Sequence, residues 1–203
     1  MWQLLLNLLG QTSNVVDLQT GLAMDRARKL GLTTENGANG TVNLDIQMFL
    51  YLHCQEMSLA TLVYEKLEHN EVGMMRFHIG WHMRVHNFCL VAIHNAKKRG
   101  LNPLKSRKWR KKARLYLSMV QTWVEDGKAI NLGHKLKLLQ AEMLTLARPY
   151  PSDELLMEAF DEAIVRSARS GFRQDAALAA AFASKAVQNK LDKMKYAQRC
   201  QEL

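Results

Sequence analysis

The sequence predicts an all-α protein in which antiparallel helix pairs stack into a solenoid. Proline, which interrupts helices, occurs only three times in 203 residues, and strand-like alternation of apolar and polar side chains is nearly absent. Leu, Ala, Met, Lys and Gln, which favour helix, are frequent. Small residues such as Ala159, Ala163 and Ala177 recur in the C-terminal part, where they would let two helices approach closely. Short helices repeated in this way are typical of a solenoid.

The N-terminal part is predicted to contain a short helix over residues 2–10 and a loop-rich segment over residues 11–42. The run Asn36-Gly37-Ala38-Asn39-Gly40 marks a break within that segment, because Asn and Gly favour turns. Asn43 is a candidate N-cap for a helix that continues to about His53. Ser58 starts the next helix, whose apolar residues have helical spacing: Leu59, Leu62, Val63 and Leu67.

The middle of the chain is predicted to form two longer helices. The first runs from about Gly73 to Lys98 and ends before Gly100, Asn102 and Pro103. Its wide apolar face consists of Phe77, Trp81, Val85, Phe88, Val91 and Ile93. The second covers residues 107–126 and has apolar residues at i, i+3, i+4 and i+7 spacing: Trp109, Ala113, Tyr116, Leu117, Val120 and Trp123.

The C-terminal part is predicted to form four further helices near residues 134–147, 153–169, 174–188 and 192–201. Ser152 or Asp153 is the expected cap of the second of these, directly after Pro151. Because no low-complexity linker divides the chain, we expect one helical domain over residues 1–203.

Positive charge is concentrated in one part of the sequence. The net charge is +9, and ten cations between Lys97 and Arg114 follow one another without an acidic residue: Lys97, Lys98, Arg99, Lys105, Arg107, Lys108, Arg110, Lys111, Lys112 and Arg114. Cations at the start of a helix oppose its dipole, so the arrangement has a local cost. The basic run therefore suggests a binding role, and the candidate partner-binding residues are Lys97, Lys98, Arg99, Lys108, Arg110, Lys111, Lys112 and Arg114.

Two interpretations of this basic run remain open from the sequence. The interpretation that we favour is a solvated face or a packing contact with a further domain, as charge runs commonly are. The basic run can also bind phosphate, nucleic acid or an acidic partner, with Trp109 as a nearby stacking surface.

Three histidines, His78, His82 and His86, recur at i, i+4 and i+8 and would share one helix face. Two adjacent histidines of this row, at i and i+4, can share a zinc ion. A further ligand could come from His53, Cys54 or His94. The alternative, which we favour, is that these histidines line a partly exposed helix face without a metal. A pH-sensitive interface is a weaker form of the same idea.

The remaining features indicate a non-enzymatic protein of a reducing compartment. Cys54, Cys89 and Cys200 are odd in number and form no CxxC motif, which favours free thiols and a cytoplasmic location. Leu4 to Leu9 is too short to span a membrane. The chain contains no phosphate-binding GxxxxGK[ST] motif, no protein-kinase motif and no nucleophile elbow, so we expect neither catalysis nor a cofactor.

Several short motifs, taken in order, resemble the TPR-like helical region of large multidomain signalling ATPases, which combine a protein-kinase-like domain, a STAND-type ATPase and sensor domains. The matching segments are Trp2-Gln3, Asn7-Leu8-Leu9-Gly10, Leu18, Gly21, Phe88-Cys89-Leu90-Val91-Ala92, Trp123, His134, Leu139, Ala141-Glu142, the Ala159–Ala168 helix, Gly171-Phe172 and Ala177-Leu178. The chain departs from the family at Ala179-Ala180-Ala181, where glutamate is common.

The resemblance implies a TPR-like solenoid that is a non-catalytic interaction and signal-relay module, and a piece of a larger multidomain protein. Its partners would be another protein or neighbouring domains of the same polypeptide. The alternative function is a helical protein that binds nucleic acid or an acidic partner through the basic run at residues 97–114.

Overall fold

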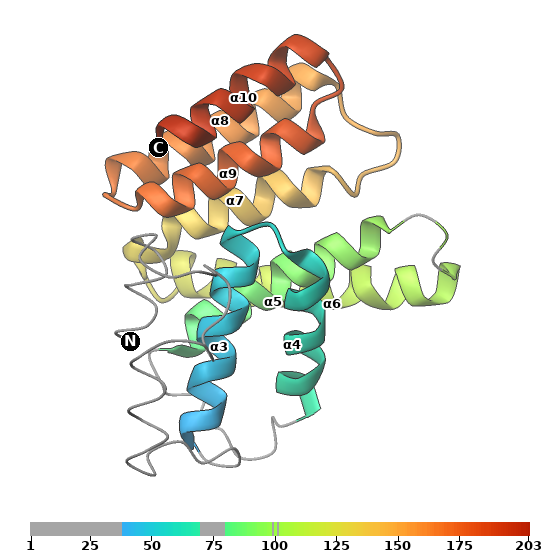
Figure 1. The fold of residues 1–203 in the computed structure, drawn as a ribbon, viewed down its shortest axis with the longest axis vertical. Coiled ribbons are helices and arrows are strands. Elements are labelled where there is room, and N and C mark those ends of the chain that lie inside the picture. Colours follow the sequence, from blue (N-terminus) through green and yellow to red (C-terminus); the bar gives the residue numbers. More distant parts are fainter. Residues whose placement is uncertain (1–37, 70–79, 99, 101) are drawn as a thin grey trace, which may run out of the picture. The chain divides into compact units, whose positions relative to one another are not determined.

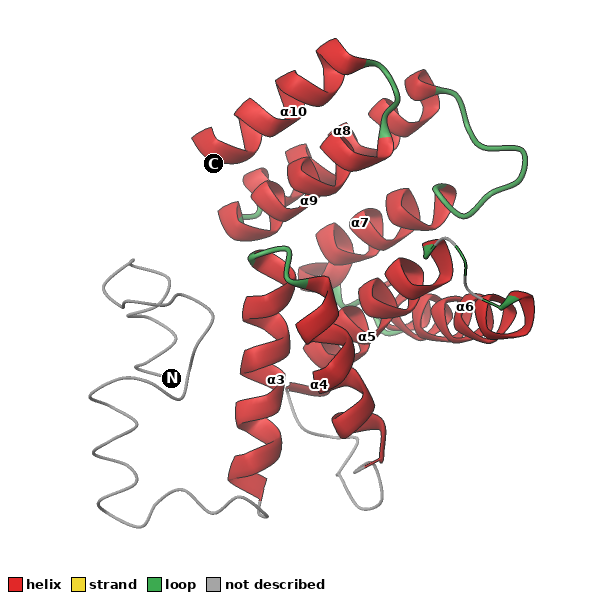
Figure 2. Ribbon diagram, turned by 45° about the vertical axis from the view of Figure 1, so that its right-hand side comes forward, coloured by secondary structure: helices red, strands yellow, loops and turns green. Residues whose placement is uncertain are grey.

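The computed structural model describes residues 38–69, 80–98, 100 and 102–203, which form α-helices and one 3-10 helix but no strand (Figures 1 and 2). An all-α fold is therefore confirmed for these residues. The chain divides into two compact units, Met1–Arg84 and Val85–Leu203. Among the described helices, none combines the length and the apolar character needed to cross a membrane. The predicted helix over residues 2–10 lies outside the described residues.

The first unit contains the helix pair α3 (Ala38–His53) and α4 (Met57–His69), together with the first turn of α5 (Gly80–Lys97). The two helices of the pair pack against each other, and Gln55 makes the turn between them with a positive φ of 61°. Their buried side chains are Met48, Leu50, Leu52, Met57, Ala60, Val63, Tyr64 and Leu67. The apolar residues that the sequence places on one face of α4 are therefore not all buried. Val63 and Leu67 are buried, whereas Leu62 is exposed.

A partly buried ion pair between Arg84 and Asp45 joins α3 to the start of α5. The Arg84 guanidinium, of which only a small fraction is exposed, donates from Nε to Asp45 Oδ1 at 2.7 Å and from Nη2 to the second carboxylate oxygen. This two-pronged geometry suits the planar guanidinium and is the strong form of a charged hydrogen bond.

The second unit contains the rest of α5, then α6 (Pro103–Glu125), the 3-10 helix η1 (Ile130–Leu132), α7 (Gly133–Leu144), α8 (Asp153–Arg169), α9 (Arg173–Ala186) and α10 (Lys190–Glu202). From α6 onward, each α-helix packs on the next one along the chain, and α7 also contacts α9. Figure 2 shows α7, α8, α9 and α10 side by side. The core of this part is rich in Leu and Ala, as the sequence predicts: Leu136, Leu138, Leu139, Ala141, Leu156, Phe160, Ala163, Ile164, Ala176, Leu178, Ala179, Ala180, Phe182 and Ala183.

Two predicted helix starts are too late in the sequence. α3 begins at Ala38, before the predicted Asn43, and runs through Gly40. A glycine inside a helix costs about 1 kcal/mol relative to alanine, which a long continuing helix can outweigh. α6 begins at Pro103 instead of residue 107. Proline at the first helical position loses no hydrogen bond, and the Asn102 side chain accepts from Leu104 N at 2.8 Å as the N-cap.

The helix predicted from about Gly73 to Lys98 corresponds to α5 over residues 80–97. Residues 73–79 lie outside the described residues. The predicted helix over residues 153–169 has the bounds of α8, and Ser152 is its N-cap, accepting from Leu155 N. The stacking of helix pairs into a TPR-like solenoid and the single domain over residues 1–203 stay predictions.

Asp153 has a different role from the predicted cap. Its carboxylate accepts hydrogen bonds from the backbone amides of Gln188 and Asn189, each at 2.8 Å. These amides lie in the turn between α9 and α10, so one side chain ties the start of α8 to that turn. Asn189 then caps α10, because its side chain accepts from Leu191 N and Asp192 N.

We expect Asp153→Ala to lower the free energy of unfolding by about 1 kcal/mol, because two backbone amides lose a charged acceptor. Urea denaturation of the purified chain measures this loss. Glu158→Ala, an exposed carboxylate on the same helix, is the control and should change stability by a few tenths of a kcal/mol. Equal losses in the two variants would contradict the role given to Asp153.

Candidate partner-binding surface

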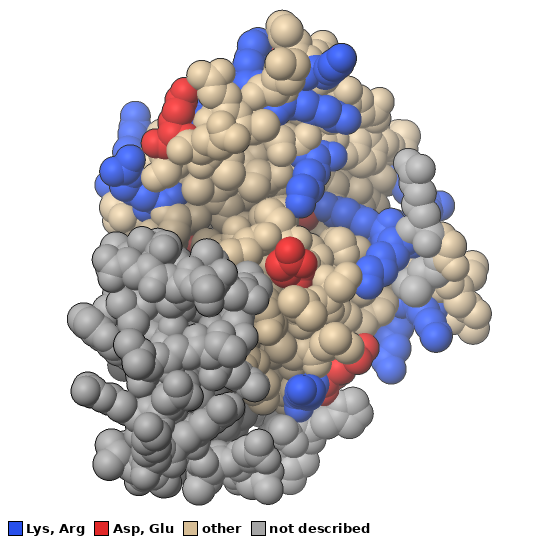
Figure 3. Space-filling model, in the orientation of Figure 1, with Lys and Arg blue, Asp and Glu red and all other residues tan. Residues whose placement is uncertain are grey.

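The outer face of α6 carries most of the basic run. Four cations, Arg107, Lys108, Lys111 and Arg114, are exposed and lie on one side of the helix because they are spaced at i, i+1, i+4 and i+7. We call this set the α6 basic face. Figure 3 shows basic side chains gathered in the region where α6 lies. The opposite side of α6 holds the buried residues Ala113 and Val120 and therefore packs on the rest of the unit.

The charges of the α6 basic face are not balanced locally. In the sequence, no Asp or Glu occurs between Glu71 and Glu125. Within the part of the chain that the structure describes, none of the four cations forms an ion pair with a carboxylate. Like charges at i and i+4 on a helix repel each other, as Arg107 and Lys111 do here. The face is thus electrostatically suited to an anionic group supplied from outside.

Two members of the predicted partner-binding set are used inside the fold. Lys97, at the end of α5, forms an ion pair with the buried Glu142 on α7, with 2.6 Å between Nζ and Oε2. Arg110 donates from Nη1 to the carbonyl of Leu146 at 2.6 Å, just beyond the end of α7. Lys97 thus provides a partner for a buried carboxylate, and Arg110 for the carbonyl of a buried residue, so their role here is structural.

The other members of the set differ in exposure. Lys98 is exposed at the end of α5, and Lys108, Lys111 and Arg114 are exposed on α6. Lys112 is half-buried, with its ammonium 5.0 Å from the centre of the Trp109 ring. Arg99 lies outside the described residues. Exposure together with position on the outer side of α6 therefore selects Lys108, Lys111 and Arg114 from the predicted set and adds Arg107 from the same run. Partner binding stays a prediction.

The histidine row is only partly described. His78 lies outside the described residues, and His82 is half-buried near the start of α5. His86 is buried, with 3.2 Å between its Nδ1 and Asn87 Oδ1. In the described ranges, no group of three His, Cys, Asp or Glu side chains is placed to hold a metal ion. The three-histidine row itself stays a prediction.

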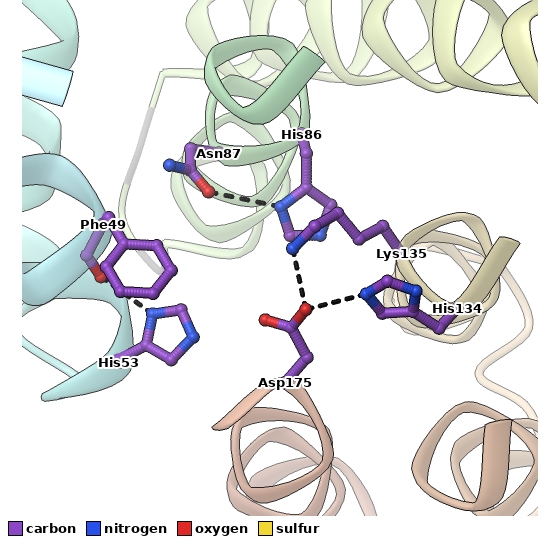
Figure 4. A network of polar contacts seen from close by, with 7 residues as sticks. All are labelled: Phe49, His53, His86, Asn87, His134, Lys135 and Asp175. Carbon is purple, nitrogen blue, oxygen red and sulfur yellow. Dashed lines mark hydrogen bonds and ion pairs between the residues drawn. The ribbon is translucent and has the colours of Figure 1, made fainter. Parts of the chain in front are cut away.

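A buried polar network that the sequence analysis missed joins α7 to α9 (Figure 4). His134 Nε2 and Lys135 Nζ each lie 2.8 Å from Asp175 Oδ2. The side chains of His134 and Asp175 are 1% and 3% exposed, so a solute has no direct access to them. The network therefore suits a structural cross-link between two helices that are separated by α8 in the sequence.

The turn between α8 and α9 positions this network. Gly171 adopts a left-handed φ of 81°, which glycine tolerates best, and Phe172 N donates to Ser167 O while Gly171 N donates to Ala168 O. This pair of bonds is the Schellman ending of a helix. It turns the chain so that Phe172 stacks on His134, with 4.2 Å between the ring centres. Asp175 follows in the first turn of α9, where the helix dipole favours a carboxylate.

A second cluster of cations surrounds His94 on α5. Burial, and to a smaller extent the neighbouring Lys98, Lys97 and Lys185, lower the pKa of His94 to about 4. His94 is therefore neutral at pH 7, while the three lysines keep the potential around it positive. Two of them, Lys97 and Lys185, belong to the last turns of α5 and α9, where cations complement the helix dipoles.

The three cysteines are free thiols, as predicted. Cys89 is buried, and its thiol donates to the Ala113 carbonyl at 3.4 Å, so it joins α5 to α6. Burial raises the pKa of Cys89, which keeps the thiol protonated and unreactive.

Comparisons with models of protein families, with curated proteins and with solved structures found no match to this chain.

We expect Asp175→Asn to lower the free energy of unfolding by about 3 kcal/mol, because Lys135 loses the buried negative charge that pairs with it and one of the two acceptor oxygens becomes a donor. Chemical denaturation measures the effect. Glu162→Gln is the matched control, since Glu162 forms an exposed ion pair with Lys137 on the same unit. That change should cost about 0.5 kcal/mol or less. A loss for Asp175→Asn no larger than the control would show that the network contributes little stability.

The His94 environment predicts that stability falls with acidity. In the unfolded chain His94 has its ordinary pKa of 6.5, whereas in the folded protein the pKa is about 4. Between these values the unfolded chain binds more protons, so the free energy of unfolding decreases as the pH falls from 6.5 to 4. Thermal unfolding of the native chain and of His94→Gln over this range measures the effect. The difference between the two proteins should change with pH, and a constant difference would contradict the prediction.

Proposed function

We propose that this chain is a non-catalytic, TPR-like helical module of a cytoplasmic signal-transduction ATPase or kinase. It binds a protein partner or neighbouring domains of the same polypeptide, and this binding shifts the activity of a linked ATPase or kinase. The relay works by differential affinity, because a bound partner favours whichever conformation it binds more tightly.

The observation that carries this proposal is the way in which α7, α8, α9 and α10 pack. Each of these helices contacts the next one along the chain. Polar contacts also join α7 to α9 and α8 to α10. α7 is joined to α9 through His134 and Asp175. α10 is joined to α8 by the ion pair between Arg199 and Asp161, 3.0 Å apart, and by Tyr196, which donates to Met157 O. Contacts to the next helix and to the one after it are what a stack of helix pairs requires.

The sequence adds a further support. The ordered motifs that include Ala141-Glu142 and Gly171-Phe172 resemble the helical region of multidomain signalling ATPases. In the structure, two residues of these motifs stabilise the fold. Glu142 is the buried partner of Lys97, and Gly171 forms the turn before α9. These roles explain why the motifs contain glutamate and glycine at these positions.

The second candidate is a protein that binds nucleic acid through the basic run at residues 97–114. The observation that favours it is the α6 basic face, which is exposed and has no acidic residue nearby in the sequence. Phosphate groups would supply the missing negative charge, and the affinity would fall steeply with salt concentration.

Photo-crosslinking in cells that make the protein tests the proposed function. We expect a crosslinking amino acid placed at exposed positions of the helices to capture a polypeptide, either a second protein or another domain of the same chain. A denaturing gel with an antibody to this segment then gives the size of the native protein. A band far above 23.2 kDa would place the module within a multidomain protein.

The controls separate this function from its alternatives. The same substitution at the buried Ala163 should give no crosslink from the folded protein, because that side chain is inaccessible. Crosslinks to nucleic acid alone, with no polypeptide captured at any exposed position, would contradict the proposed function and support the second candidate.

A further inference from the structure

We propose that the α6 basic face and two exposed leucines beside it bind an acidic amphipathic helix of a protein partner. The inference rests on the proposed function, since it names the class of partner that an interaction module of this kind would take. The leucines are Leu104 and Leu115, which are 74% and 57% exposed. Both lie on the outer side of α6 together with the four cations.

The charges define one side of the recognition. Arg107, Lys111 and Arg114 follow one another at i, i+4 and i+7 and cover about 10 Å along the helix axis. A second helix lying along α6 would present Glu or Asp side chains at the same spacing over the same length. Arginine binds carboxylates through two parallel hydrogen bonds, which favours such a pairing over diffuse attraction.

The leucines define the other side and separate a protein partner from nucleic acid. Leu104 and Leu115 are eleven residues apart, which is close to three helical turns, so they lie on one face at the two ends of the cations. An apolar side chain placed against a phosphate backbone gains little, because phosphates remain hydrated. Against apolar side chains of an amphipathic helix, each leucine removes exposed apolar area from water.

The state of Trp109 points the same way. Single-stranded nucleic acid binds basic surfaces that also offer exposed aromatic rings for base stacking. Trp109 is half-buried, and the ammonium of Lys112 lies 5.0 Å from its ring centre. The aromatic ring that the sequence suggested for stacking is thus already engaged within α6.

The arrangement of α6 also argues against a membrane surface and against a second copy of this chain. A helix that lies on a membrane separates its apolar face from its basic face. In α6 the main apolar face points into the fold, and the exposed leucines stand among the cations. A second copy would bring together two chains of net charge +9, which repel each other.

Fluorescence anisotropy with a labelled synthetic peptide tests this surface. The probe is a helical peptide of about 18 residues, or five turns, with Glu at i, i+4 and i+7 spacing and Leu at both ends of that row. A second peptide has the same charges but Ser in place of Leu. A DNA duplex and vesicles rich in phosphatidylserine are the competing probes. We expect the first peptide to bind best, and the Ser peptide to bind about tenfold more weakly.

Variants of the chain identify the residues that carry the binding. Lys111→Glu combined with Arg114→Glu should abolish peptide binding, and Leu104→Ser combined with Leu115→Ser should weaken it about tenfold. Lys190→Glu combined with Lys193→Glu on α10 is the matched control, because it makes the same change in net charge at exposed positions. All these side chains are exposed, and circular dichroism verifies that each variant keeps its helix content.

Three results would overturn the proposal. Equal binding of the Leu and Ser peptides would show attraction by charge alone. Tighter binding of the DNA duplex or of the vesicles would assign the face to a different class of partner. An equal loss in the α10 control would show that only net charge matters. If crosslinking still captures a polypeptide at another surface, the proposed function stands while this inference fails.

Discussion

The second unit depends on satisfying the polar groups of one nearly enclosed helix, α7. Its buried residues come from every side of the helix and include His134 and Glu142. A helix that packs on all sides is stable only if its charged groups and its last carbonyls find partners. Lys97 on α5 satisfies Glu142, and Asp175 on α9 satisfies His134. Arg110 on α6 donates to Leu146 O, just beyond the end of α7. Ion pairs and hydrogen bonds thus hold the helices around α7 in place, in addition to apolar packing.

This constraint explains why neighbouring cations in one run have opposite roles. Successive residues of a helix are turned by about 100° around its axis, so a run of cations must point to several sides. Arg110 points toward the end of α7 and is used within the fold, whereas Lys108 and Lys111 point outward. A sequence pattern that counts charges alone treats these residues alike. Their positions around the helix decide which stabilise the fold and which remain available to a partner.

The helices of this protein could be predicted from local patterns, because each needs only the spacing of apolar residues and a few capping residues. Ser152 before α8 and the apolar spacing in α6 are examples. The starts of α3 and α6 do not follow from these local patterns, because Gly40 and Pro103 are typical of breaks. A helix nevertheless tolerates glycine inside a long run and proline at its first position. The sequence predicts the basic run, but only the packing separates the cations on the outer side of α6 from Lys97 and Arg110, which bind groups within the fold.

The polar cross-links could not be predicted, because their partners are far apart in the sequence and have no local signal. His134 and Asp175 lie on different helices, and nothing in the residues around Asp175 distinguishes it from a carboxylate that favours the start of α9.

In α6, by contrast, the sequence itself carries a signal, which is the order of its charges. Lys105 lies in the first turn of this helix, its last turn has no basic residue, and Glu125 lies at its end, so both ends carry charges that the helix dipole disfavours. The cations that follow Lys105 also repel one another at i and i+4. Within the described residues no carboxylate offsets this cost for Arg107, Lys108, Lys111 or Arg114. Local rules tend to be broken where a protein binds something, so the unfavourable charge order of α6 is itself an argument for a partner at that face.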